Sequence, residues 1–328
     1  MEDVAREAGV SGQTVSRVVN ARGYVGAGTR VRVEDAMQRL GYRPNSAARA
    51  LRSGRFRTIG VVMFSFSSYG NQRTLDAIAV RAAQLGYALT LIPVESSARD
   101  TVVGAFRRLE EHAVDGIIIV IEAHQLDEAD IEIPSGLPVV FVDSNRAADH
   151  PFVDTDQAQG ARLATEHLLA LGHETVWHVA GPAKSYSAER RREAWQSTLE
   201  AGGRPVPEPL PGDWSAASGY EAGVALREIE GVTAVFAAND QMAIGVLRAF
   251  REAGRGVPED VSIVGFDGLP DAAQLWPPLT TVLQHPERVG AFAVDALLAE
   301  LDGRERQRTP LVGTELVVRG STAPPPRR

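Results

Sequence analysis

The sequence contains no cysteine among its 328 residues. This absence excludes disulfide bonds, thiolate metal sites and cysteine nucleophiles. The sequence also lacks an apolar run that approaches the roughly 20 residues needed to span a bilayer. Its first residues, MEDVAREAG, lack the basic and apolar stretches of a secretory signal. These absences favour a cytoplasmic protein that does not cross a membrane.

The composition and the charge distribution indicate a globular protein with a basic head. Apolar residues make up 44% and charged residues 23%, as in ordinary globular proteins, and the length suits two or three domains. The net charge of −8 hides an asymmetry, because residues 1–57 carry +6 and the remainder carries −14. A basic head on an acidic body is typical of a segment that contacts phosphates. An arginine-rich face exposed to solvent would give the same charge, so charge alone decides nothing.

The head shows the pattern of three short helices. Gly9 separates the first two helical patterns, and Ser11 can cap the second. A helix, a turn with glycine and a helix with polar outer positions predict a helix-turn-helix. The expected buried faces are Val4, Ala5 and Ala8 in residues 3–8, Val15, Val18 and Val19 in residues 11–20, and Val31, Ala36, Met37 and Leu40 in residues 29–41.

Residues 44–54, PNSAARALRSG, predict a short bridging helix. Pro44 redirects the chain, Asn45 can cap the helix and Gly54 stops it. So short a helix is marginal alone in water, and we expect it to form only when something holds it.

From Thr58 onward, short apolar runs alternate with helical patterns. TIGVVMF, YALTLIPV, DGIIIVI and PVVFVD form one series, and ETVWHVAG, VTAVFAA and DVSIVGF form a second. Continuous β-branched runs between helices predict parallel sheets covered on both faces, and two such series predict two doubly wound lobes. A last helix at about 286–302 and the strand LVGTELVV are expected to return across both lobes, and the tail TAPPPRR is expected to be disordered.

These patterns predict an α/β core with an all-α head. The head spans residues 1–43, the hinge helix and linker 44–57, and the core 58–328. The expected lobes of the core are about 58–156 with 286–313, and about 157–285 with 314–322.

Several stretches carry a family resemblance in a fixed order. DVAREAGVSGQTVSRVVN resembles the head of the lactose repressor (LacI/GalR) family of bacterial transcriptional regulators, and RPNSAARAL resembles its hinge helix. EHLLALGH, GDWSAASGY, ANDQMAIGVLRAFREAG, DVSIVGFD and PPLTTV resemble its sensor core. The resemblance covers nearly the whole chain, and it implies a periplasmic-binding-protein-like sensor core behind a helix-turn-helix head and a hinge helix.

The resemblance implies a set of DNA-binding residues. Gln13 and Arg17 would read bases, since glutamine pairs with adenine and arginine with guanine in a bidentate way. Without the family, both would be ordinary helix surface, and Leu51 would be a minor core residue. Gly12 departs from the resemblance, which implies a large base-reading side chain there. The remaining implied residues are Thr14, Ser16 and Asn20 on phosphates, Asn45 at the hinge, and Leu51 as a wedge in the minor groove.

A second set of residues is expected at a small-molecule site. Ligands of open α/β sheets bind beyond the carboxyl ends of strands, where Phe64, Asp143, Asn239 and Asp267 are expected. The resemblance implies that Trp214 stacks on a sugar ring, although it could also be a core aromatic; Trp195, mid-helix, is expected to pack. The hydroxyl-binding residues implied are Arg191, Asn239, Asp267 and Gln284, with Asp143 nearby.

The expected function is a homodimeric repressor that a small, galactoside-like sugar releases from double-stranded operator DNA. Phe64 and Gly268 depart from the resemblance at the sugar site, so a different effector stays open. A corepressor that strengthens DNA binding is a separate alternative. A transporter-type sugar-binding protein is disfavoured, because it needs a signal peptide and no helix-turn-helix. A sugar-processing enzyme is disfavoured too, because no nucleophile and base pair is found and the aspartates suit binding without chemistry.

The sequence gives no reason to expect a cofactor or a metal. GYVGAG follows no strand and GPAKS lacks the spacing of a phosphate loop. His167 and His173 are too widely spaced for one helical metal face. At the ends, Met1 lies almost at a helix onset, so the true start is expected upstream; the tail shows no leucine heptads, which favours a dimer over a tetramer.

Overall fold

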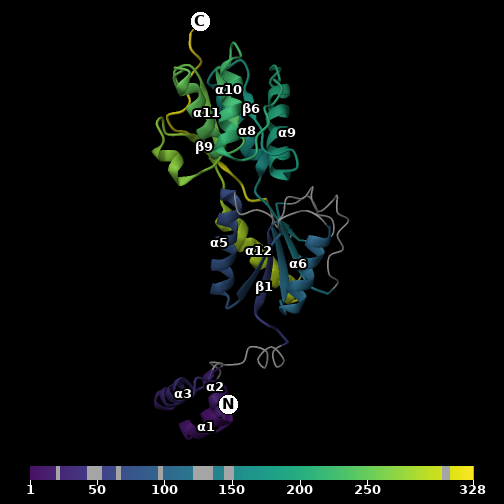
Figure 1. Cartoon of the computed structure of the whole chain (residues 1–328), viewed down its shortest axis with the longest axis vertical. Coiled ribbons are helices and arrows are strands. Elements are labelled where there is room, and N and C mark those ends of the chain that lie inside the picture. The colour runs from purple at the N-terminus through teal and green to yellow at the C-terminus, as the bar shows by residue number, and fades with distance from the viewer. Residues whose placement is uncertain are drawn as a thin grey trace. The chain divides into compact units, whose positions relative to one another are not determined.

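The computed structural model describes residues 1–19, 23–42, 54–63, 68–94, 99–120, 136–143, 151–304 and 311–327 (Figure 1). The chain divides into two compact units, Met1–Phe56 and Arg57–Arg328. In the described residues, no helix has the length and apolar character to cross a membrane.

The first unit is a bundle of three helices around a small apolar core. Gly9 ends α1 in the left-handed region, at φ 64°, which glycine adopts without steric cost. Ser11 accepts a hydrogen bond from the Thr14 amide at 3.2 Å, so the expected cap of α2 is confirmed. The helices are α1 (Glu2–Ala8), α2 (Gly12–Val19) and α3 (Ala27–Arg39), and the core holds Val4, Ala5, Ala8, Val15, Val18, Val33 and Ala36.

The buried face of α3 differs from the expected one. Val31 is 54% exposed and Leu40 47% exposed, whereas Val33 is fully buried. Val33 and Ala36 lie on one face at helical spacing, and Val31 lies two residues, about 200°, away from Val33. Leu40 follows the last helical residue, Arg39, where the chain turns away.

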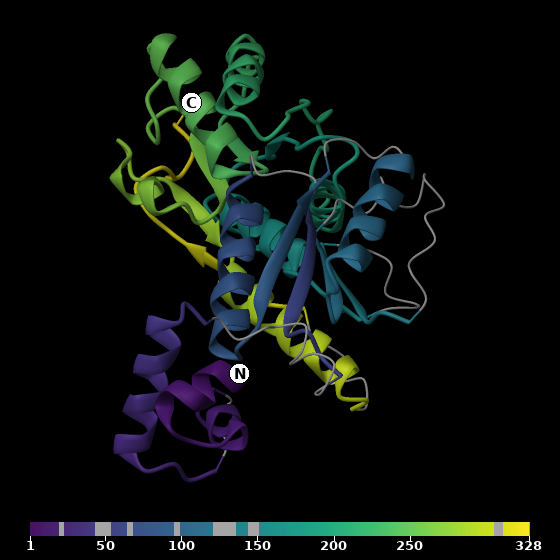
Figure 2. The same ribbon diagram turned by 60° about the horizontal axis from the view of Figure 1, so that its bottom comes forward.

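The second unit begins with a five-stranded parallel sheet. Strand residues alternate between two apolar layers: Val61 and Met63 pack with α5 and α12, whereas Val62 packs with α6. Helices α5 and α12 lie side by side on their face of the sheet (Figures 1 and 2). The strand order is β2-β1-β3-β4-β5. The elements are β1 (Thr58–Met63), α5 (Tyr69–Gln84), β2 (Ala88–Pro93), α6 (Arg99–Glu111), β3 (Gly116–Val120), β4 (Val139–Val142), β5 (Phe152–Val153) and α12 (Pro286–Leu301).

A second five-stranded sheet has the order β10-β9-β8-β7-β6, with β6 to β9 parallel and β10 antiparallel at one edge. Helices α8 and α9 cover one face and α10 and α11 the other. The elements are α8 (Gln157–Ala170), β6 (Trp177–Val179), α9 (Tyr186–Ala201), α10 (Ala216–Arg227), β7 (Ala234–Ala237), α11 (Asp240–Glu252), β8 (Ser262–Asp267), the 3-10 turn η1 (Pro270–Gln274), β9 (Thr280–Leu283) and β10 (Glu315–Val317). The expected α/β class with two doubly wound lobes is confirmed.

The last part of the chain joins both lobes. Helix α12 packs in the core of the first lobe, and β10 then pairs antiparallel with β9 of the second. The expectation of a disordered tail was wrong, because the Ala323 amide donates to the Ser262 hydroxyl at 2.9 Å, and His173 and His167 bond to Ala323 and Thr322. Polar groups at this end of the second lobe thus find their partners in the tail.

Candidate functional site

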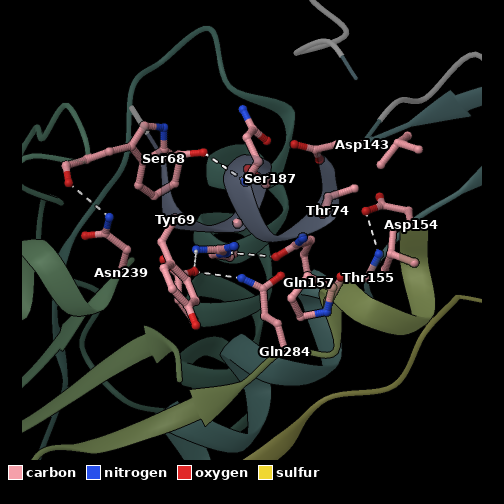
Figure 3. A pocket seen from close by; sticks show the side chains of 18 residues that line it. Ser68, Tyr69, Thr74, Asp143, Asp154, Thr155, Gln157, Ser187, Asn239 and Gln284 are labelled. Atoms are coloured by element: carbon pink, nitrogen blue, oxygen red, sulfur yellow. Dashed lines mark hydrogen bonds and ion pairs between the residues drawn. The ribbon is translucent and has the colours of Figure 1, made fainter. Parts of the chain in front are cut away.

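Polar side chains from both lobes line one pocket beyond the carboxyl ends of the strands. Asp143 follows β4, Asp154 follows β5, Asn239 lies two residues after the end of β7, and Asp267 is the last residue of β8. This edge is where parallel sheets bind ligands. The lining residues are Ser68, Tyr69, Gly70, Asn71, Thr74, Val142, Asp143, Asp154, Thr155, Gln157, Ser187, Arg191, Trp214, Asn239, Asp267, Gln284, Pro286 and Val289 (Figure 3).

The pocket gathers unusual backbone conformations. Among the described residues, five that are not glycine have a positive φ, and three of these line the pocket. They are Asp143 at 58°, Trp214 at 72° and Asp267 at 109°. A non-glycine residue in this region costs free energy, and such residues cluster where a ligand must be held. The backbone therefore marks the pocket independently of its side chains.

Arg191 of α9 is the charged centre of the second-lobe wall. It is 4% exposed, its Nε donates to Gln157 at 2.8 Å, and an Nη donates to the carbonyl of Ala238. Its guanidinium lies 3.5 Å from the Asp267 carboxylate. Burial lowers the pKa of Arg191, and the surrounding aspartates oppose this shift only in part. The guanidinium stays charged because its ordinary pKa lies far above neutral pH.

Asp267 and Gln284 extend the network around Arg191. The Gln284 amide donates to the Asp267 carboxylate at 2.7 Å. Burial raises the pKa of Asp267 to about 6, although Arg191 and Gln284 pull it down. Three side chains thus present a fixed array of donors and acceptors, which suits paired hydroxyl groups.

Asn239 has a positioning role that the sequence did not indicate. Its side-chain oxygen caps α11 by accepting from the Met242 amide at 2.8 Å. Its amide donates to the backbone carbonyl of Trp214 at 3.0 Å, so it ties the aromatic loop to the start of α11 (Figure 3). Most of its hydrogen-bonding capacity is used inside the protein.

The Trp214 ring is held by close contact with the backbone of Gly181. A Cβ at Gly181 would lie 2.3 Å from the ring, so only glycine fits there. The ring also packs against the apolar core of the second lobe. Trp214 therefore packs with the core and also lines the pocket, and its stacking on a sugar ring stays a prediction. Trp195 is 1% exposed and donates to the Val176 carbonyl, which confirms its expected packing role.

The first-lobe wall carries two neighbouring acids. Burial raises the pKa of Asp143 to about 6, against the pull of Arg191. Burial and the nearby charge of Asp143 together raise the pKa of Asp154 well above its ordinary value. Figure 3 shows Asp143, Asp154 and Thr74 on one side of the pocket and Asn239 on the other.

Six of the seven residues expected at the small-molecule site lie in this pocket; the seventh, Phe64, lies outside the described residues. Sequence reasoning missed Asp154, Gln157 and Ser187. Gln157 and Ser187 sit at helix starts beside the strand ends, and an acid directly after a strand was the available signal for Asp154. That signal was hidden because β5 has only two residues.

The head places the expected DNA-reading side chains on α2. Gln13 and Arg17 are exposed and stand four residues apart, on one face of the helix. Thr14 bonds to Ser11 and is half-buried, as is Ser16. Gly12 begins the helix, and a Cβ there would meet open space. Asn20, Asn45 and Leu51 lie outside the described residues.

A helix-turn-helix unit with an exposed polar face and a two-lobed core with a polar pocket define a ligand-responsive DNA-binding regulator. A model of "Bacterial regulatory proteins, lacI family" matches residues 1–45, and one of "Periplasmic binding protein-like domain" matches residues 165–322. The chain belongs to the lacI family and is a DNA-binding transcriptional repressor.

Individual relatives agree over almost the full length. The lactose operon repressor of Escherichia coli (strain K12) is 37% identical over 98% of this chain and 90% of its own. The repressor PurR of Pasteurella multocida (strain Pm70) is 32% identical over 98% of each chain. A crystal structure of the lac repressor dimer bound to operator and the anti-inducer ONPF matches with a TM-score of 0.88 at 36% identity, over 98% of each chain. The transcriptional regulator CelR–cellobiose complex matches with a TM-score of 0.71 at 30% identity, over 98% of each chain. These relatives are transcriptional regulators.

Proposed function

We propose that this repressor binds operator DNA as a homodimer and leaves it when a small carbohydrate occupies the pocket. The observation that carries the proposal is the hydrogen-bonded array of Arg191, Asp267 and Gln284 beside the Trp214 ring. Sugars need planar polar groups for adjacent hydroxyls and an aromatic face for their C–H surface, and the pocket supplies both. Asn239 positions Trp214, and Asp143 accepts a hydrogen bond from a further donor of the ligand.

Within the carbohydrates, a galactoside-like sugar is our first candidate. It is supported by the 37% identity to the lactose operon repressor. The names of other relatives point to different effectors, since a ribose operon repressor is 29% identical and another relative is in complex with cellobiose. The candidate therefore rests on similarity, whereas the broader class rests on the pocket.

On DNA, we propose that Gln13 and Arg17 read base edges in the major groove. A good bidentate contact discriminates against the wrong base by about 1–3 kcal/mol. Thr14, Ser16 and Asn20 would bind phosphates, and Asn45 and Leu51 would act from a hinge at residues 44–57, after a head of residues 1–43 and before the core of 58–328. The positive charge of residues 1–57 supports this proposal.

The dimer face that we propose lies at the 3-10 turn of the second lobe. Trp276 is 82% exposed beside a groove that Ile244, Leu247 and Leu275 line. Arg248 and Glu252 flank the same groove, and charges of both signs allow one surface to meet its own copy about a two-fold axis. Two-fold symmetry in turn fits a near-palindromic operator with two half-sites.

Ligand and DNA need no direct contact in this mechanism. A ligand held between two lobes favours one relative arrangement of them, and DNA favours another. The ligand then shifts the equilibrium by its difference in affinity for the two states.

The test titrates the complex of full-length protein with operator DNA, selected from a random library, against a panel of neutral and amino sugars. DNA release is followed by fluorescence anisotropy, and pocket occupancy by tryptophan fluorescence. We expect at least one sugar to change both signals, and Trp214→Ala to abolish the response while DNA affinity stays within about threefold. Trp195→Phe is the matched control, because Trp195 does not line the pocket. If no sugar changes either signal, or if Trp214→Ala loses DNA binding but still responds, the proposal is wrong. A sugar that tightens DNA binding would show a corepressor instead.

A further inference from the structure

Two acids occupy neighbouring positions at the end of the first-lobe sheet. Strands β4 and β5 run parallel, with Val142 opposite Val153. Asp143 and Asp154 are the next residues of these strands, so the pairing brings them together at a strand spacing of about 4.8 Å. Asp154 is 6% exposed, and both acids line the pocket.

The protein leaves this pair of acids poorly compensated. The Oδ1 atom of Asp143 is buried and has no hydrogen-bond partner among the described residues. Asp154 accepts a hydrogen bond from the amide of its own neighbour, Thr155, at 2.6 Å. Buried polar atoms in native proteins are normally paired, so an unpaired carboxylate oxygen facing a pocket calls for a donor from a ligand.

The charges of the residues that line the pocket also favour a ligand that brings a donor to these two acids. Its described residues include three aspartates, at 143, 154 and 267, and one cationic side chain, Arg191. Arg191 is bonded to Gln157 and Ala238 and forms an ion pair with Asp267. Arg190 also acts on Asp154 but does not line the pocket, and it donates to the Tyr186 hydroxyl. Arg191 also attracts Asp143 and Asp154, so one cation is shared among the three acids of the described lining.

We propose that the natural effector carries a protonated amino group as well as hydroxyls, and that Asp143 and Asp154 bind this group. The inference rests on the proposed function, because it specifies the ligand of the same pocket. An ammonium group supplies one positive charge and three donors, enough for both carboxylates, whereas a hydroxyl supplies one donor and no charge. The hydroxyls of the same ligand would meet Arg191 and Gln284 on the opposite wall. An amino sugar fits this description.

A metal ion is a weaker fit for the same acids. In the described part of the chain, no group of three or more histidine, aspartate or glutamate side chains is placed to hold a metal ion. An organic cation needs only the two carboxylates.

The test compares matched sugars that differ at one substituent. D-galactosamine, D-galactose and N-acetyl-D-galactosamine form one series, and the corresponding gluco sugars form a second, so the result does not depend on one stereochemistry. Binding to the full-length protein is measured by calorimetry at pH 7, and release of operator DNA by anisotropy. In at least one series, we expect the amino sugar to bind about tenfold more tightly than its neutral and acetylated counterparts, as a close ion pair would provide.

The variants assign the preference to the two acids. Asp154→Asn and Asp143→Asn keep the shape of the side chains, and each is expected to reduce the preference to about twofold or less. Asp76→Asn removes the same charge from the exposed surface of α5 and should leave the preference unchanged. Circular dichroism confirms that each variant is folded.

The outcomes separate the two proposals. If a neutral sugar releases DNA and the amino sugar binds no better, the amino-group inference is overturned and the proposed function stands. An amino preference that survives both acid variants also overturns the inference. If no sugar of either series, and none of the wider panel, binds or releases DNA, the proposed function fails and the inference fails with it.

Discussion

The two walls of the pocket are built differently. On the second lobe, Arg191, Asp267, Asn239 and Gln284 each have hydrogen-bond or ion-pair partners within the protein. On the first lobe, Asp143 has an unpartnered buried oxygen and lies next to a second acid, Asp154. One wall is organised before a ligand arrives, and the other is completed only by the ligand. The difference teaches that affinity for hydroxyls and selectivity for charge can be placed on separate lobes.

The largest expected effect concerns the organised wall. Arg191→Leu removes the cation from a buried network and leaves Asp267, Gln157 and the Ala238 carbonyl without it. Breaking a buried charge pair on one side costs about 3–5 kcal/mol, so we expect the free energy of unfolding to fall by that amount. Urea denaturation measures it.

Arg192→Leu is the matched control for that experiment, because Arg192 is the next residue of α9 and is exposed. It should change the free energy of unfolding by less than about 0.5 kcal/mol. Equal effects of the two variants would contradict the view that the second-lobe wall is organised around Arg191.

The incomplete wall should show itself in the pH dependence of stability. The pKa of Asp143 is raised to about 6 in the folded protein, from an ordinary value near 3.8. Between about pH 4 and 6, the folded state therefore holds a proton that the unfolded state has lost. The stability that protonation of Asp143 contributes is complete below about pH 4 and is lost as pH rises through about 6. Asp143→Asn should therefore raise the free energy of unfolding by roughly 1–2 kcal/mol at pH 7.5 and little at pH 4.5.

A group with the opposite shift provides the contrast. Hydrogen bonds from Ser215 and Ser218 lower the pKa of the exposed Asp213. Its stabilisation is present above the ordinary pKa and is lost as pH falls through the folded value, so Asp213→Asn should be neutral or destabilising at pH 7.5. Thermal melts of both variants at pH 4.5, 6 and 7.5 check the signs. A destabilised Asp143→Asn at pH 7.5 would show that the first-lobe acids already have adequate partners.

The smallest expected effect concerns Ser68, and it tests whether Asp143 and Asp154 alone select the amino group on the first-lobe wall. Ser68 lines the pocket and also caps α5, where it accepts from the Asn71 amide at 3.3 Å. Ser68→Ala should lower the free energy of unfolding by about 0.5–1 kcal/mol, as loss of a helix cap does, and leave the preference between amino and neutral sugars unchanged. Ser185→Ala removes the corresponding cap of α9 on the second lobe and should cost a similar amount. A change of sugar preference in Ser68→Ala would extend the selective wall beyond the two acids.

Much of this architecture could be predicted because it is encoded locally. Continuous apolar runs predicted the strands, and the residues after them predicted Asp143, Asn239 and Asp267 at the pocket. Errors arose where local pattern and tertiary packing disagree. Val31 was expected on the buried face of α3 because it is apolar, but the packing of α3 buries Val33 instead. The tail looked disordered because proline-rich ends usually are, yet Thr322 and Ala323 bond to residues of the second lobe.

By itself, the sequence determined the class of the fold, the helix-turn-helix head and most of the residue types at the pocket, because periodicity and strand ends follow from local chain geometry. Tertiary structure alone decided which of these residues act together. It placed Asp154 beside Asp143 through a two-residue strand. It also made Asn239 the cap of α11 and left a buried oxygen of Asp143 without a partner among the described residues. Those outcomes depend on register and burial, which arise only when distant segments pack against each other.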